Sequence, residues 1–484
     1  MTLLAHLRTS GRAEVSLADR RTQFAIFSFL LAGAILFHQA QLAAWEVFSP
    51  HTVVSLSAIF VLLRPSSVAR FLAMLAIHLL SMLIDMPYVV NHWLLLGLTT
   101  VGLGIPLAVA ALRRRPWLRD PGELYRRMAP VVRIQVVLVY LFAVLAKLNT
   151  DFLNPALSCA AQMSQGLLED MPLSLYASWQ DGPAIWVTLL IEAFLPIGLL
   201  IRRTRVATIV VGGTFHTALG VAGHIPFSGF AFAFYALFLP DDMPRRLRGL
   251  METSPRLRSA ALGVARLARS PAAFPVLAGG WVAALAVLSY LPGTVFFFLL
   301  YTAALGVVLF LCLRQAKLAA YQPGAFRLAH PLWGIAPVLV VLNAVTPYLG
   351  LKTQNTFTMY SNLQTEEGYW NHAIFPEEMR IFDLQDAPIR IVSSDDERLA
   401  RAARDGTRLV EYDLLHHLSE NPDTDVVYSQ GGQMVRVSGT AQKPAVNSPS
   451  VIERKLFLFR DIPAEQRNTC RSRRDAFAGP QNGS

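Results

Sequence analysis

The chain has 484 residues, of which 53% are hydrophobic and only 16% are charged. This length suits about three soluble domains, but the composition is too apolar for a surface that faces water. The net charge of +10 would favour nucleic acid if the basic residues gathered on one soluble face, but they lie in connections between apolar runs. The composition therefore excludes an ordinary soluble or nucleic-acid-binding protein and predicts that the main partner is the lipid bilayer.

Unbroken apolar runs of nearly membrane-spanning length recur from Phe24 to Leu349. Only helices and closed barrels satisfy the backbone in hydrocarbon, and these runs lack the alternation of barrel strands. Residues 23–350 are therefore predicted to form an all-α polytopic transmembrane bundle of about 10–11 helices. Two runs are short, which leaves a re-entrant or partly interfacial position open for the segments at Val53 and Phe227. The predicted spans begin near Phe24, Val53, Phe71, Trp93, Val131, Ala184, Val206, Phe227, Phe274, Val295 and Trp333.

Basic residues fall in every second connection, as the positive-inside rule requires of cytoplasmic loops. Residues 1–22 contain arginines but no cleavable apolar core, so this segment is predicted to be cytoplasmic and the first span to be an uncleaved anchor. Short loops and such an anchor favour a bacterial inner membrane, with the C-terminal part outside. The basic connections contain Arg20–Arg21, Arg64 with Arg70, Arg113–Arg115 with Arg126–Arg127, Arg202–Arg205, Arg245–Arg248 and Arg314–Lys317.

The composition becomes that of soluble protein from about residue 351. A small α+β extracytoplasmic domain is predicted for residues 351–467, followed by a flexible tail at 468–484. Glu397–Leu418 is predicted to be helical, and Gly431–Gly432 is typical of a hairpin turn. Period-two stretches predict strands at Ile389–Val392, Val426–Tyr428, Met434–Val437 and Lys455–Phe459.

Three cysteines are too few for a disulfide framework. On the predicted topology Cys159 and Cys470 both lie outside, where an oxidising compartment allows a bridge, whereas Cys312 lies near the inner face. Sequence alone does not give the geometry that decides pairing. No metal-ligand spacing, phosphate loop or nucleophile elbow is present.

Ionisable residues inside or beside the membrane are the main functional candidates. Lys147 ends an apolar segment at the outer side of its span, where a lysine often only extends its ammonium to the interface. The alternative is a catalytic base, because apolar surroundings disfavour the ammonium and a neutral amine can accept a proton. Glu192 lies in mid-span, so it requires a partner or protonation, and a helix–helix hydrogen bond is the simpler explanation.

Three further polar positions fall in the outer half of the membrane on this topology. Asn91 and His92 begin the fourth span, and His216 lies inside the seventh. An interfacial histidine and a hydrogen-bonded core histidine are the simpler interpretations of His92 and His216, while His224 is loop-like and weaker. Together with Lys147, however, these side chains can converge on one site.

The segment from Tyr140 to Phe152, YLFAVLAKLNTDF, resembles the segment that carries the catalytic lysine of vitamin K-dependent gamma-glutamyl carboxylase, within the wider group of HTTM-domain membrane proteins. Asn91–His92, Phe215–His216 and the aromatic run from Phe227 to Pro240 match other features of that group in the same order. The resemblance is strongest over residues 20–240.

The resemblance implies that Lys147 is the base that deprotonates the hydroquinone and that His92 is an active-site histidine. Asn91, His216 and Glu192 are then expected near the cofactor. Reduced vitamin K or a menaquinol-type hydroquinone is the implied cofactor, with O2 and CO2 as co-substrates; in the family, its oxygenation drives removal of a γ-proton from glutamate before carboxylation.

Parts of the sequence depart from the family pattern. Ala146 stands where the carboxylase has a second lysine, Phe152 stands where it has tryptophan, and the exterior domain is much smaller. The domain opens with polar residues, of which Asn362 and His372 are candidate substrate contacts or simply parts of a solvated turn.

Three classes of function therefore remain open. The first is a quinol-dependent, carboxylase-like enzyme with a protein, peptide or other acceptor, or one that retains only the oxygenation half of the reaction. The second is a small-molecule transporter, although the paired broken helices of inverted repeats are not evident. The third is a noncatalytic membrane partner protein.

Overall fold

The computed structural model describes residues 15–42, 50–169, 177–288, 293–314, 321, 324–438 and 449–462. The first 14 residues, Lys317, Cys470 and the predicted tail at 468–484 lie outside the described residues. The chain divides into two compact units. Unit 1 comprises residues 1–78, 99–134 and 198–336, and unit 2 comprises residues 79–98, 135–197 and 337–484.

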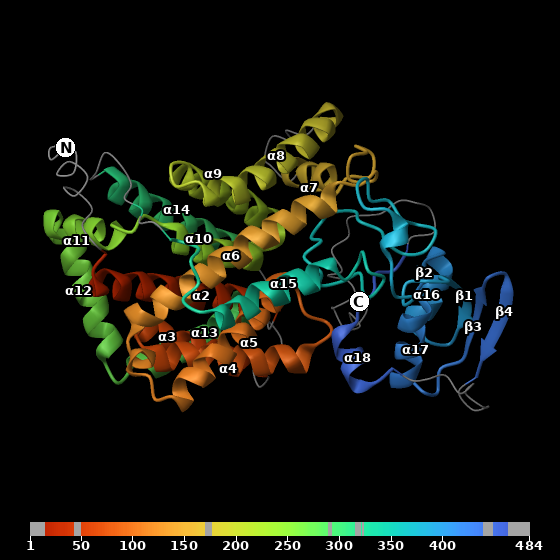
Figure 1. Ribbon diagram of the computed structural model, residues 1–484, viewed down its shortest axis with the longest axis horizontal. Coiled ribbons are helices and arrows are strands. Elements are labelled where there is room, and N and C mark those ends of the chain that lie inside the picture. The colour runs from red at the N-terminus through yellow and green to blue at the C-terminus, as the bar shows by residue number, and fades with distance from the viewer. Residues whose placement is uncertain are drawn as a thin grey trace, which may run out of the picture. The chain divides into compact units, whose positions relative to one another are not determined.

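The described chain is mostly helical, as predicted (Figure 1). Seven described segments are long and apolar enough to cross a bilayer, as expected of a polytopic membrane protein: Leu17–Ala40, Val68–Asp85, Asn91–Leu112, Pro121–Lys147, Ser178–Leu200, Arg205–Phe238 and Val295–Arg314. Shorter apolar helices occupy Pro50–Leu63, Ala273–Ala284 and Pro331–Val345.

The helices fall into two groups by length. The long ones are α2 (Leu17–Leu42), α4 (Val68–Asp85), α5 (Asn91–Leu112), α6 (Pro121–Lys147), α8 (Asp181–Leu200) and α14 (Gly293–Arg314). The shorter ones are α3 (Pro50–Leu63), α7 (Cys159–Glu169), α9 (Arg205–Leu219), α10 (Ile225–Tyr235), α11 (Met243–Thr253), α12 (Pro255–Arg269), α13 (Ala273–Leu288) and α15 (Ile335–Val345).

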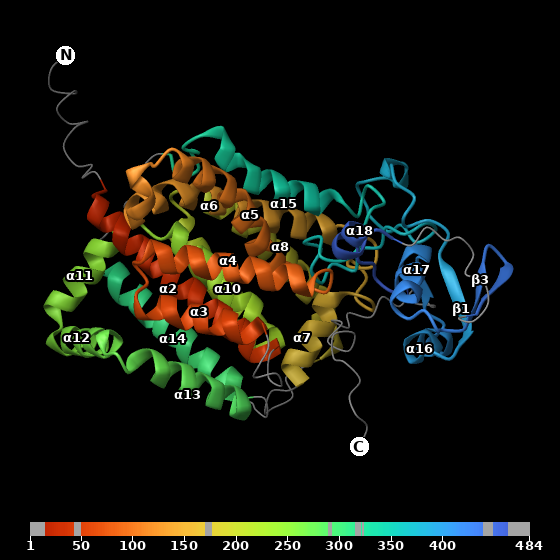
Figure 2. The same cartoon turned by 90° about the horizontal axis from the view of Figure 1, so that it is seen from below.

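In unit 1, helix α2 packs closely against α10 and α3 (Figure 2). A Cβ atom at Gly229 would make an ordinary van der Waals contact, 3.4 Å from the Cα atom of Ala34, so the two helices lie close together at a pair of small residues. Small residues serve this purpose at helix contacts in membranes, where close van der Waals packing replaces the hydrophobic effect. The α2–α10 pair therefore forms an extensive helix contact in unit 1.

The apolar run Arg205–Phe238 is a hairpin of two helices. Its turn, η3 (Gly220–His224), contains Gly223 at φ +96°, a left-handed conformation that glycine adopts without penalty. The His216 ring lies 5.9 Å from the ring of Tyr235, 19 positions along the chain, which a straight helix would place much farther away. The sequence therefore placed two segments here correctly. The run counts among the seven by its total length and composition, but each of its two helices is shorter than the roughly 20 residues that cross a bilayer.

Ion pairs join several of the predicted cytoplasmic connections at one end of unit 1. Arg248 Nη2 lies 2.6 Å from Asp19 Oδ1, and Arg21 pairs with Asp120. Arg133 Nε donates a hydrogen bond of 2.7 Å to the Leu237 carbonyl at the end of the hairpin. Segments that begin α2, precede α6 and form α11 therefore share one arginine-rich end.

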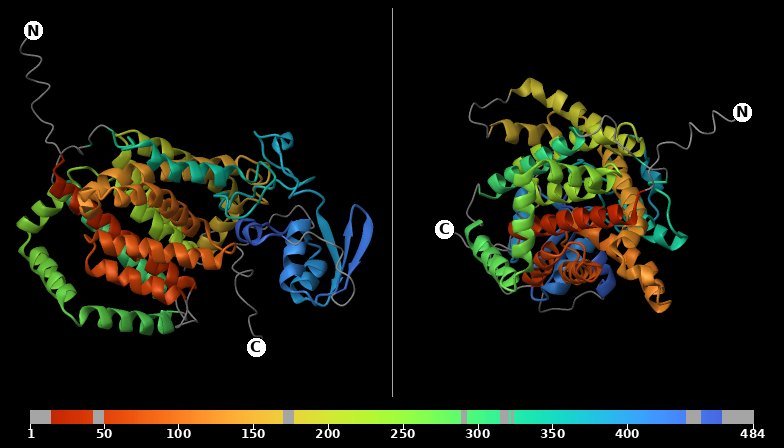
Figure 3. Two further views of the ribbon diagram at one scale, coloured as in Figure 1. Left: turned by 60° about the horizontal axis from the view of Figure 1, so that its bottom comes forward. Right: turned by 90° about the vertical axis from the view of Figure 1, so that its left-hand side faces the viewer.

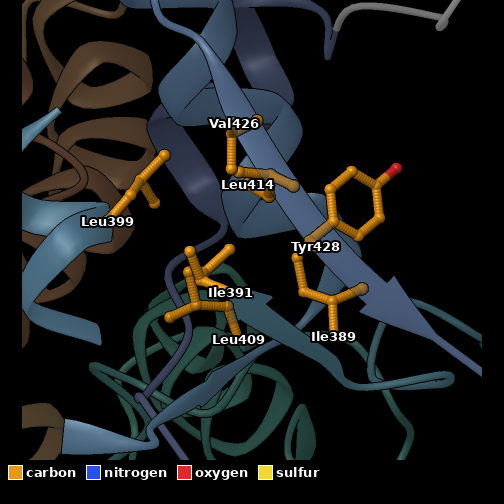
Figure 4. Packing of buried hydrophobic residues seen from close by; sticks show 7 residues of the cluster. All are labelled: Ile389, Ile391, Leu399, Leu409, Leu414, Val426 and Tyr428. Carbon is orange, nitrogen blue, oxygen red and sulfur yellow. The ribbon is translucent and has the colours of Figure 1, made fainter. Parts of the chain in front are cut away.

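The C-terminal region of unit 2 contains a four-stranded antiparallel sheet in the order β2-β1-β3-β4. Its helices α16 (Glu397–Asp405) and α17 (Glu411–Glu420) contribute Leu399 and Leu414 to the apolar core (Figure 4). The strands are β1 (Ile389–Ser394), β2 (Arg408–Leu409), β3 (Val426–Gln430) and β4 (Gln433–Val437). The predicted small α+β region and the hairpin turn between β3 and β4 are thus confirmed.

One local prediction in this region is confirmed with an added detail, and another is wrong. The stretch Glu397–Leu418 is helical as expected but contains two helices, because Gly406 adopts φ +67° at the end of α16 and β2 follows. The strand expected at Lys455–Phe459 is preceded and partly replaced by α18 (Val451–Leu456). Ser450 and Glu453 form a capping box that starts this helix, a local signal that outweighs the short alternating pattern.

Candidate active site

Lys147 is the last residue of α6, and its side chain is almost fully buried within unit 2. Its Nζ atom lies 2.8 Å from Glu192 Oε2 and donates a hydrogen bond of 3.1 Å to the Met359 carbonyl. The ring centroid of Phe152 is 5.8 Å from the same nitrogen. The lysine is therefore held in place by an ion pair and a hydrogen bond rather than extended to an aqueous interface.

Glu192 projects from the middle of α8, and its side chain is only 12% exposed. An unpaired carboxylate at such a position is costly, and Lys147 supplies the partner that the sequence required. Ile185 and Leu189 lie seven and three positions before Glu192, so all three side chains share one helix face. This face therefore places a carboxylate at the end of an apolar stripe.

The apolar stripe of α8 belongs to a small cluster beside the ion pair. Phe152 is completely buried in this cluster, and Tyr360 packs against it. The other members are Cys159, Ala160, Ile185 and Leu189, with Leu148 also in contact. Lys147 and Glu192 thus combine proton-carrying groups with an adjoining aromatic and aliphatic wall.

The segment after α15 that provides the Met359 carbonyl has a strained backbone. Asn355, Phe357, Tyr360 and Asn362 all adopt positive φ angles, from 49° to 61°. Left-handed backbone costs roughly 1–2 kcal/mol per non-glycine residue and is least common for bulky residues such as phenylalanine and tyrosine. Strain of this kind gathers at functional sites, so we define residues 355–362 as the strained loop.

Asparagine side chains fasten the strained loop to the end of α6 and to the start of α7. Asn149 Nδ2 donates to the Ser361 carbonyl, and its Oδ1 accepts a hydrogen bond of 2.8 Å from the Phe152 amide. Asn362 Oδ1 accepts a 2.8 Å hydrogen bond from the Cys159 amide. The candidate Asn362 is therefore brought to this site, where its side chain holds the loop that contacts Lys147.

His372, the other candidate in the C-terminal region, also fastens this end of α6. Its Nδ1 accepts hydrogen bonds from the Ile374 and Phe375 amides, so Nε2 carries the proton and donates to the Leu145 carbonyl at 2.9 Å. Burial lowers the pKa of His372, which favours this neutral form. Both ring nitrogens already have backbone partners, so the geometry favours positioning over substrate contact.

Asn91 approaches the strained loop from the start of α5. Its Oδ1 accepts a hydrogen bond of 2.9 Å from the amide of Phe357, one of the left-handed residues. His92 is the next residue on α5 and is partly exposed. The structure therefore brings Asn91, Lys147, Glu192, Asn362 and His372 to one region of unit 2, with His92 on the adjoining turn.

His216 belongs to unit 1, so it is described separately from the Lys147 region. It is completely buried in the α9–α10 hairpin, and its ring centroid lies 5.0 Å from that of Phe227. The rings of Phe215 and Tyr235 also surround it. An aromatic enclosure of this kind suits either a packed histidine or the wall of a flat ligand.

Arg460 is a part of the site that the sequence did not reveal. Its guanidinium donates to the Leu363 carbonyl at 2.9 Å and to the hydroxyl of Thr358, one residue before Met359. Glu366 lies nearby, and burial raises its pKa although the charge of Arg460 opposes that change. A lone arginine in a short alternating segment carries no sequence signal for such a role, because its partners are about 100 residues away.

Cys159, at the start of α7, is disulfide-bonded, whereas Cys312 has a free and buried thiol. Cys470 lies outside the described residues, so its predicted pairing with Cys159 stays a prediction. Among the described residues, no group of three or more His, Cys, Asp or Glu side chains is placed to hold a metal ion.

Comparisons with known proteins do not identify this chain. No protein-family model matches it, and neither a curated protein nor a solved structure matches it significantly.

Proposed function

We propose that this protein is an integral membrane enzyme of the quinol-dependent, carboxylase-like type, in which Lys147 and Glu192 together accept the proton of a hydroquinone. The observation that carries the proposal is the buried ion pair of 2.8 Å, held beneath a strained loop and beside an apolar wall. A merely structural lysine at the end of a span has no need of so specific an arrangement.

The pair acts as one acid–base unit in this proposal. A substrate hydroxyl transfers its proton to Lys147 Nζ while the ammonium transfers another proton to Glu192 Oε2. One O–H bond breaks on the substrate and one forms on Glu192, so the lysine keeps the same number of protons. Because the carboxylate takes up the proton, this route does not require that the lysine begin as a free neutral amine.

The residues around the pair fit a hydroquinone. Phe152 and the apolar face of α8 suit a flat apolar ring, and the amine suits its hydroxyl group. A bound hydroquinone supplies electrons for reaction with O2, and the carboxylase type couples that reaction to addition of CO2 to a glutamate or other acceptor. Reduced vitamin K and menaquinol both carry the required group.

The remaining candidates take positioning or binding roles in the proposal. Asn91, Asn362 and His372 hold the strained loop and the end of α6 through hydrogen bonds. His92 is proposed to face the reacting groups from the first turn of α5. The proposed cofactor-binding role of His216, in unit 1, rests on the resemblance alone. These roles extend the resemblance to the carboxylase residue by residue.

The proposed topology places the N-terminus in the cytoplasm and the C-terminal α+β region outside a bacterial inner membrane. Its main support is the alternation of basic connections along the sequence. The ion pairs Arg248–Asp19 and Arg21–Asp120 add support, because they gather three of these connections at one end of unit 1. The proposed acid–base pair lies near the opposite, outer end of α6.

The test is oxygen-dependent epoxidation of reduced menaquinone or vitamin K by the purified full-length protein in detergent. Lys147→Ala and Glu192→Gln should abolish turnover, because each removes half of the proton-accepting pair. Lys352→Met is the matched control, since Lys352 is also a buried lysine of unit 2 but makes no ion pair within the described chain. The control should retain activity.

The alternative functions predict different results in the same assay. A folded wild-type protein that is saturated with quinol but shows no turnover would refute the enzyme and favour a membrane partner protein or a transporter. Equal losses in Lys147→Ala and Lys352→Met would show that any buried lysine is needed for folding, which would remove the special role of the pair.

A further inference from the structure

Helix α12 is a basic amphipathic helix outside the proposed active site. At 100° per residue, its apolar residues fall on one face, while Arg258, Arg266 and Arg269 fall on the opposite side with Ser259. Arg256 borders the two faces, and Leu262 and Ala265 depart from the pattern. The apolar face contains Leu257, Ala260, Ala261, Val264, Leu267 and Ala268.

No described residue of the protein covers either face of α12. None of the helix's residues is buried, and the side chains of Leu257, Val264 and Leu267 are 43%, 68% and 67% exposed. None of the four arginines makes an ion pair within the part of the chain that the structure describes. Both an apolar stripe and a positive stripe are therefore presented to the surroundings.

The neighbours of α12 fix its level relative to the bundle of unit 1. Preceding it, α11 is tied to the start of α2 by the 2.6 Å ion pair between Arg248 and Asp19. Following it, α13 begins at Ala273 and packs against α3, with the rings of Phe274 and Phe60 5.7 Å apart. Figure 3 shows the three helices following one another along one edge of the bundle.

The chain therefore passes through α12 directly from an arginine-rich end to an apolar helix. Only three residues separate α12 from α13. On α13, the side chain of Val276 is 67% exposed, as expected of a side chain that faces lipid. A connection this short keeps the end of α12 close to the boundary between water and hydrocarbon. Its apolar stripe then meets acyl chains and its arginines meet lipid phosphates.

We propose that α12 lies in the plane of the bilayer surface and binds the headgroups of anionic phospholipids through Arg256, Arg258, Arg266 and Arg269. Charge complementarity selects anionic over zwitterionic lipid, because each basic residue near an anionic surface is attracted to it. A soluble protein partner does not explain why the apolar stripe continues into the lipid-facing surface of α13. This assignment is independent of the proposed enzymatic activity.

The test uses full-length protein with Cys312 replaced by serine, reconstituted in nanodiscs of phosphatidylcholine with or without phosphatidylglycerol. Nitroxide labels at Val264→Cys and Ser259→Cys report the two faces of the helix through their accessibility to oxygen and to a water-soluble nickel chelate. With phosphatidylglycerol present, nickel accessibility at position 264 should be several-fold lower than at position 259, because the apolar face is immersed.

Replacing the four arginines of α12 by glutamine should abolish the difference in nickel accessibility between positions 264 and 259. Pure phosphatidylcholine or high salt should abolish the same contrast. The matched control replaces Arg113, Arg114, Arg115 and Arg119, exposed arginines in another basic connection, and should keep it. Equal nickel accessibility at the two labelled positions in the wild-type helix would overturn the proposal. A contrast that persists in pure phosphatidylcholine and after the four α12 substitutions would overturn the assignment to anionic lipid.

Discussion

Removal of either partner of the Lys147–Glu192 pair should destabilise the protein more than removal of both. At 2.8 Å, two unit charges attract by about 6 kcal/mol if the effective dielectric constant is about 20. Much of this attraction offsets the cost of burial, and a buried charge left without its partner typically costs about 3–5 kcal/mol. We expect a loss of that size for Lys147→Met and for Glu192→Leu.

The double variant should recover much of the stability, because no unpaired charge remains. Unfolding of full-length protein by sodium dodecyl sulfate in mixed micelles, followed by tryptophan fluorescence, measures all four members of the cycle. The control cycle replaces Arg401 and Glu397, an exposed ion pair of 3.2 Å in α16, and should give a coupling energy of about 0.5 kcal/mol or less. Additive losses at Lys147 and Glu192 would refute the argument that they form one buried electrostatic unit.

Four further predictions follow from other parts of the structure. Burial lowers the pKa of Lys352 from 10.5 to about 8. The cost of burying its charged amine, about 3 kcal/mol of folding free energy, is fully present below pH 8 and disappears as pH rises to 10.5. Lys352→Met should therefore raise the unfolding midpoint at pH 7 but hardly at pH 10.5. Leu414→Ala should destabilise the α+β region by about 2–5 kcal/mol, measured as faster amide exchange in β1 and β3, because its side chain is fully buried. If the guanidinium of Arg460 positions the strained loop, Arg460→Gln should lower kcat by about 100-fold with a smaller change in KM. Arg460→Lys should restore part of the rate. An unchanged kcat in Arg460→Gln would show that Arg460 does not position the loop for catalysis. Under denaturing conditions without reductant, Cys312 should be the one thiol that reacts with maleimide, and reductant should expose Cys159 and its partner; peptide mapping then tests whether that partner is the predicted cysteine.

Sequence patterns were sufficient for the parts of the fold that depend on local physics. Long apolar runs predict helices because no other unclosed structure satisfies the backbone in hydrocarbon. The strands at Ile389 and Val426 and the turn at Gly431 follow from alternation and from glycine's conformational freedom. Where the predicted strand at Lys455–Phe459 failed, a competing local signal was present, namely the capping box at Ser450 that starts α18. Gly406 is a similar local signal, which divides the predicted helical stretch into α16 and α17.

The sequence by itself also marked Lys147 and Glu192 as residues that need an explanation, because charges in an apolar segment are costly. Only the tertiary structure shows that each of these two side chains is the ion-pair partner of the other. They lie on different helices, and no periodicity along the chain predicts a 2.8 Å contact between positions so far apart. The same holds for Arg460, whose role depends on backbone carbonyls about 100 residues earlier. The left-handed angles of Phe357 and Tyr360 likewise reflect surrounding contacts, since their own side chains disfavour that conformation.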